Sequence, residues 1–162
     1  MAIDGVKIID SDQAYDIYNE VVDRYRDGEQ VANIIKDILD AEKDYCQTDF
    51  FTEIYWTALA YSLWKIGHLT DDIRDKTLEL IKKGADPFWL EIDSKALKQR
   101  QKVLDKLAIH LQTENPRPLK VTKAKTKRKP YFEEGDLLTV KFQDEYGLVF
   151  VSMVEQSPRK LE

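Results

Sequence analysis

The chain changes character abruptly near residue 115, and this change limits what it can fold into. Residues up to Glu114 are acidic overall and repeat the apolar spacing of helices. Residues 116–130 carry seven Lys or Arg and no Asp or Glu. From Tyr131 onward, apolar and polar residues alternate as they do in β-strands. The sequence therefore predicts two folding units of different chemistry joined by a basic segment.

The first unit, residues 1–114, is predicted to be an antiparallel helical bundle or a short solenoid of about five helices. Apolar residues recur at i, i+3 and i+4 in five segments, which begin near residues 12, 31, 48, 70 and 94. Ser11, Thr48 and Thr70 are suitable N-caps, and Gly67 fits a helix end. The chain is therefore expected to be mainly α-helical.

Two further regions follow the helices. Residues 115–130 are predicted to be a basic flexible linker, because they lack apolar periodicity. Residues 131–162 are predicted to form a β-hairpin or an incomplete small β-domain. A lone hairpin is marginally stable in water. The hairpin is therefore expected either to pack on the helices or to open a larger β-domain that is cut short in this chain.

Residues 48–66 are apolar nearly all the way round the predicted helix, which indicates a central helix packed on several sides. Trp64 is expected to lie in the core. The dense aromatic set between Phe50 and Trp89 is also mainly core. Trp56 or Trp89 is the candidate for partial exposure as an interface anchor, because Trp is enriched at binding hot spots.

Charge is concentrated in the first third of the chain. Residues 1–60 carry 14 acidic and 5 basic side chains. Five carboxylates fall on one side of the first predicted helix and are called the acidic stripe: Asp12, Asp16, Glu20, Asp23 and Asp27. The stripe is either a solvated outer face or a docking face for a basic partner.

No pattern in the sequence points to catalysis. His68 and His110 are the two histidines, and neither has a Cys or carboxylate at metal-ligand spacing. We expect no catalytic residues, no cofactor and no metal site. The longest apolar stretch, near Tyr55–Trp64, is too short to span a bilayer. Cys46 is the single cysteine, which suits a reducing, cytoplasmic location.

Several landmarks together resemble a known group. They are Trp56-x-Ala58-x-Ala60, then Trp64-Lys65-x-Gly67, Gly84-Ala85-Asp86 with Trp89, Phe132-x-x-Gly135-Asp136 and Tyr146-Gly147. This set resembles uncharacterised bacterial proteins with a helical domain before a Gly-Asp-containing β segment. The tail is similar to the opening of immunity-protein β-domains of bacterial toxin systems. The resemblance implies a non-catalytic partner of a basic toxin or enzyme.

Three functions follow as expectations. The first is an intracellular protein-binding module that uses the acidic stripe and Trp89 toward a basic protein. The second is a nucleic-acid-associated module that uses the basic segment to contact phosphates. The third is a scaffold or regulatory domain. The sequence does not indicate the oligomeric state.

Overall fold

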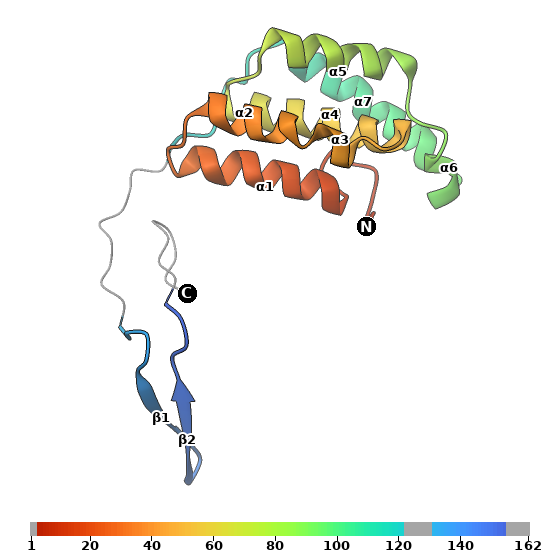
Figure 1. Cartoon of the computed structure of the whole chain (residues 1–162). Coiled ribbons are helices and arrows are strands. Elements are labelled where there is room, and N and C mark those ends of the chain that lie inside the picture. Colours follow the sequence, from red (N-terminus) through yellow and green to blue (C-terminus); the bar gives the residue numbers. More distant parts are fainter. Residues whose placement is uncertain (1–2, 122–130, 155–162) are drawn as a thin grey trace. The chain divides into compact units, whose positions relative to one another are not determined.

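The computed structural model describes residues 3–121 and 131–154, and within these residues it has seven helices and two strands (Figure 1). The predicted fold class, mainly helical with a C-terminal antiparallel hairpin, is confirmed. The basic residues 122–130 lie outside the described part. The elements are α1 (Asp12–Arg26), α2 (Val31–Asp40), α3 (Glu42–Tyr45), α4 (Asp49–Ile66), α5 (Asp71–Lys83), α6 (Trp89–Ile92), α7 (Ala96–Leu111), β1 (Leu137–Phe142) and β2 (Glu145–Phe150).

The chain divides into two compact units, Met1–Val121 and Thr122–Glu162. In the first unit α4 is the central helix, and it packs against α1, α3, α5 and α7. Figure 1 shows α1 and α5 on either side of it. Its buried residues lie all round its circumference, as its apolar composition predicted. The core of the unit is therefore built around one helix.

Local capping signals fix several helix ends where the sequence placed them. The Ser11 hydroxyl accepts a hydrogen bond from the Ala14 amide at 3.2 Å and begins α1. The Thr48 hydroxyl accepts from the Phe51 amide at 3.3 Å and begins α4. Gly67 ends α4 in a left-handed conformation with φ of 76°. The two hydroxyls and the Gly67 backbone amide satisfy backbone groups that a helix end leaves without partners.

Residues 115–121, which the sequence placed in the linker, pack against the end of α4. The Asn115 side-chain amide donates to the carbonyls of Trp64 and Lys65, each at 3.2 Å. The Leu119 amide donates to the Lys65 carbonyl at 2.9 Å. A Cβ atom at Gly67 would lie 2.9 Å from Pro118, so a glycine is needed there. This segment is ordered because it satisfies the last carbonyls of α4.

The second unit contains the hairpin. Strands β1 and β2 pair antiparallel, from Leu137 opposite Phe150 to Phe142 opposite Glu145. The connecting turn is Gln143–Asp144. At the open end the Gly135 amide donates to the Val151 carbonyl at 2.9 Å, with Gly135 at a φ of 95°. Gly135-Asp136 thus closes the open end of the hairpin.

Trp64 differs from the expectation that it lies in the core, because it is only partly buried. Its indole nitrogen donates to the Thr113 carbonyl at 2.8 Å, and its ring stacks on His110 with centroids 4.9 Å apart. An indole N–H needs a hydrogen-bond partner. Trp64 finds one at the C-terminal end of α7, so its ring joins α4 to α7 at the surface.

Substitutions at two adjacent positions of α4 should separate these roles. We expect Leu63→Ala to lower the free energy of unfolding by about 3 kcal/mol, because Leu63 is fully buried. Trp64→Phe keeps most of the ring packing and loses one hydrogen bond, so it should cost about 1 kcal/mol. Urea unfolding followed by circular dichroism measures both. A loss at Trp64 equal to that at Leu63 would return Trp64 to the core.

Candidate functional site

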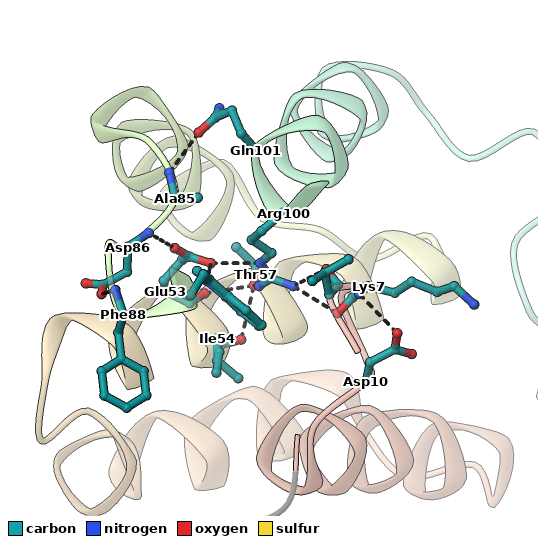
Figure 2. Close-up of polar contacts among 12 residues, drawn as sticks. Lys7, Asp10, Glu53, Ile54, Thr57, Ala85, Asp86, Phe88, Arg100 and Gln101 are labelled. Carbon is teal, nitrogen blue, oxygen red and sulfur yellow. Dashed lines mark hydrogen bonds and ion pairs between the residues drawn. The ribbon is translucent and has the colours of Figure 1, made fainter. Parts of the chain in front are cut away.

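A buried ion pair joins α4 to α7 and is the most elaborate polar arrangement of the helical unit (Figure 2). Arg100 Nε donates to Glu53 Oε1 at 2.8 Å, and the two side chains are only 1% and 6% exposed. Burial lowers the pKa of Arg100, and the charge of Glu53 works in the opposite direction. A buried charge is tolerated when it is paired and hydrogen-bonded.

The other two nitrogens of the Arg100 guanidinium also have hydrogen-bond partners. Arg100 Nη1 donates to the carbonyls of Val6 at 3.1 Å and Lys7 at 2.9 Å. Its Nη2 donates to the Thr57 hydroxyl at 3.2 Å. The guanidinium carbon lies 4.8 Å from the centre of the Trp89 ring, a cation–π distance. Arg100 therefore ties the N-terminal segment, α4 and α6 to α7.

The Glu53 carboxylate holds the loop between α5 and α6. Its Oε2 accepts from the Asp86 amide at 2.7 Å, and its Oε1 accepts from the Trp89 indole at 3.2 Å. Gln101, next to Arg100 on α7, accepts from the Ala85 amide at 2.8 Å (Figure 2). The ion pair contacts groups of this chain, so its role is to hold the loop between α5 and α6 in place.

The position of Trp89 corrects the sequence-based hypothesis that it is a partly exposed anchor. Trp89 is only 1% exposed, because Glu53 and Arg100 hold its ring in the core. Trp56, the other candidate, is 4% exposed. The neighbours of Trp89 point outward instead.

Three large apolar side chains around Trp89 are exposed, and together they are called the α6 patch. They are Phe88 at 50%, Leu90 at 49% and Ile92 at 41%. The Phe88 ring packs against the Phe50 ring, with ring centroids 4.7 Å apart. Exposed Glu91 and Asp93 lie between and beside these residues. The α6 segment thus has three exposed apolar side chains, with the exposed carboxylates Glu91 and Asp93 next to them in the chain.

The acidic stripe is exposed at all five positions, Asp12, Asp16, Glu20 and Asp23 in α1 and Asp27 at its C-terminal cap. Glu20 pairs with Arg24 of the same helix at 2.8 Å. Arg24 also contacts Glu29 and Asp37, and these carboxylates raise its pKa. The stripe therefore lies on a helix that Arg24 fastens to α2, with Glu20 partly neutralised.

The histidines and the cysteine have surroundings without a catalytic arrangement. His110 stacks on Trp64, and His68 lies 5.4 Å from the Tyr25 ring. Burial raises the pKa of the Cys46 thiol, which disfavours the reactive thiolate. Among residues 3–121 and 131–154, no group of three or more His, Cys, Asp or Glu has the geometry to hold a metal ion.

A cleft of about 450 Å³ lies beside the end of α4 and is lined in part by Arg74, Glu114 and Pro118. The Arg74 guanidinium is already paired with Asp71 at 2.7 Å and Asp75 at 2.9 Å. The cleft therefore presents no unpaired Arg74 cation.

Comparisons of this chain with family models, curated proteins and solved structures found no match. Within the described residues, no helix is long and apolar enough to cross a membrane. The α6 patch and the acidic stripe are the candidate functional surfaces.

Removing one member of the buried pair should be far more damaging than removing a surface pair. We expect Arg100→Met to cost about 3–5 kcal/mol of unfolding free energy, because Glu53 is left as an uncompensated buried charge. Adding Glu53→Gln should recover part of this loss. Arg74→Met, which removes an exposed pair, is the control and should cost about 1 kcal/mol or less. Urea unfolding measures all three. Equal costs for Arg100→Met and Arg74→Met would show that the buried pair has no special role.

Proposed function

We propose that the helical unit is a non-catalytic protein-binding module that uses the α6 patch to contact a basic protein. The observation that carries this proposal is the exposure of Phe88, Leu90 and Ile92 in and just before α6, which follows a loop that a buried ion pair holds in place. Exposed large apolar side chains are a feature of many protein interaction sites.

The rigidity of the loop supports the proposal. Binding is weakened by the entropy lost when a contact loop becomes ordered. Here Glu53 and Gln101 fix the backbone of Asp86 and Ala85 before any partner arrives. The loop therefore presents the α6 patch at a reduced entropic cost.

Charge supports a basic partner. Glu91 and Asp93 lie next to the α6 patch residues in the chain, and the acidic stripe adds five exposed carboxylates in α1 and at its C-terminal cap. Clustered charge of one sign speeds the encounter with a partner of the opposite sign. An immunity-type protein that binds a basic toxin or enzyme is one form of this function. The proposal places the protein in the cytoplasm, where a thiol such as Cys46 remains reduced.

The α6 patch is tested by adding charge to it. A partner is first captured from a bacterial lysate with the parent protein and purified. We expect Leu90→Asp with Ile92→Asp to weaken binding of that partner by about 100-fold, since truncated hot spots cost 2 kcal/mol or more. Ile109→Asp is the matched control, because Ile109 is an exposed apolar residue on α7. Unchanged binding by the double variant would remove the α6 patch from the interface.

The acidic stripe is tested through the association rate. Asp16→Lys with Asp27→Lys leaves the Glu20–Arg24 pair intact and should slow association several-fold at low salt, with a smaller effect at high salt. Asp72→Lys with Glu79→Lys makes the same charge change at exposed positions of α5. Stopped-flow or surface plasmon resonance measures the rates. Equal slowing by the two pairs would assign the effect to net charge alone.

A further inference from the structure

Helix α7 carries a row of exposed lysines, called the α7 lysine row. It consists of Lys95 at the N-cap and Lys98, Lys102 and Lys106 in the helix, at spacings that place them on one side of it. In the part of the chain that the structure describes, none of the four forms an ion pair with a carboxylate. The row extends over about 16 Å, at 1.5 Å of helix rise per residue.

These lysines belong to a basic part of an acidic unit. Residues 1–60 carry 14 acidic and 5 basic side chains, and they make the helical unit negative overall. Residues 95–121 carry 2 acidic and 7 basic side chains. Asp105 is the only carboxylate of α7, and it accepts a hydrogen bond from Gln101 at 2.8 Å. Exposed charges more than about 8–10 Å apart are largely screened at physiological salt, so a ligand on α7 responds chiefly to the lysines beside it.

An apolar groove, called the α7 groove, begins where the α7 lysine row ends. Its apolar lining includes Ile8, Ile9 and Val103, and Lys7 and Lys106 also line it. Its volume is about 260 Å³. Pockets for drug-sized ligands are typically about 300–1,000 Å³. The α7 groove therefore suits one flat ring of a larger ligand better than a whole drug-sized molecule.

Two aromatic side chains also line the α7 groove, Tyr61 of α4 and His110 of α7. Trp64 stacks on both of them. Its ring centroid lies 6.4 Å from that of Tyr61 at an interplanar angle of 24°, and 4.9 Å from that of His110 at 12°. His110 is exposed, and Lys65 Nζ lies 5.8 Å from the centre of the Tyr61 ring. The wall of the groove thus contains nearly parallel rings with cations beside them.

The combination of rings and lysines selects the ligand. A single nucleotide strand repeats an anionic phosphate and a flat base, and proteins that bind such strands combine a basic groove with aromatic side chains on which bases stack. A run of Asp or Glu in an acidic protein would pair with the lysines but would leave the rings without a partner. In a duplex the faces of the bases are already stacked on one another. The face therefore fits a single strand.

We propose that the α7 lysine row and the α7 groove bind single-stranded nucleic acid. The phosphates lie along Lys98, Lys102 and Lys106, and one base enters the α7 groove and stacks on His110. This inference is independent of the proposed function, because it uses neither the α6 patch nor the acidic stripe.

The first test is the binding of a fluorescein-labelled oligothymidylate to the full chain, followed by fluorescence anisotropy. We expect micromolar affinity at low salt that falls as salt rises. Lys102→Glu with Lys106→Glu should weaken binding about tenfold or more. Lys36→Glu with Lys82→Glu makes the same charge change at exposed positions of α2 and α5, and it should have a much smaller effect. Equal weakening by the two pairs, or no binding by the parent protein at low salt, would overturn the proposal.

The second test concerns the rings. His110→Ala should weaken binding about tenfold, in the range measured for the stacking of one base, and His110→Phe should restore it. Circular dichroism checks that both variants are folded. An abasic strand of the same length keeps the phosphates and should bind about tenfold more weakly than the oligothymidylate. Equal binding of the abasic strand would overturn the proposal. Equally tight binding of a polyglutamate of the same length would also overturn it and would assign the face to an acidic protein.

Discussion

The arrangement of the helical unit depends on one buried interaction, the pair between Glu53 and Arg100. Taking two charges out of water carries a penalty that their mutual attraction repays only with good geometry and further hydrogen bonds. The fold meets this condition with donors and acceptors from four separate segments. An apolar pair of similar volume would fill the same space, but it would not fix the backbone amide of Asp86. The pair therefore contributes more to the position of a loop than to the packing of a core.

The position of this loop explains how the candidate surface arises. A four-residue helix has too few hydrogen bonds to define its own orientation. Here α6 is oriented by Trp89, which the ion pair holds in the core. With the indole directed inward, Phe88 and Leu90 on either side of it are directed outward. Burial of the Trp89 ring in the core therefore leaves the neighbouring apolar side chains exposed at the surface.

The sequence predicts the helices, the central place of α4 and the hairpin, because these follow from local periodicity and capping. Ser11, Thr48 and Gly67 act within a few residues of their own positions. The exposure of the acidic stripe follows from the same periodicity. Trp89 could not be placed correctly, because α6 is too short to show which of its sides is apolar.

The ion pair was also missed, although the sequence contains a signal for it. Arg100 falls among the inward positions Ala96, Leu104, Leu107 and Leu111, and Glu53 lies on a helix that is apolar nearly all round. A charged residue on a buried face of each of two helices indicates a buried pair. The pattern of one helix does not show which residue of another helix meets it, so the pairing appears only in the structure.

The contacts of Arg100 also set an order of events during synthesis of the chain. Arg100 is separated by 47 residues from Glu53 and by 94 and 93 residues from Val6 and Lys7. A ribosome releases the N-terminal part first, at about 5–20 residues per second. Helices α1 to α4 therefore leave the ribosome before Arg100, the cation that pairs with the Glu53 carboxylate. The hydrogen bonds from Arg100 to the Val6 and Lys7 carbonyls can therefore form only after α7 has left the ribosome, so one of the first segments to be made gains one set of its contacts late.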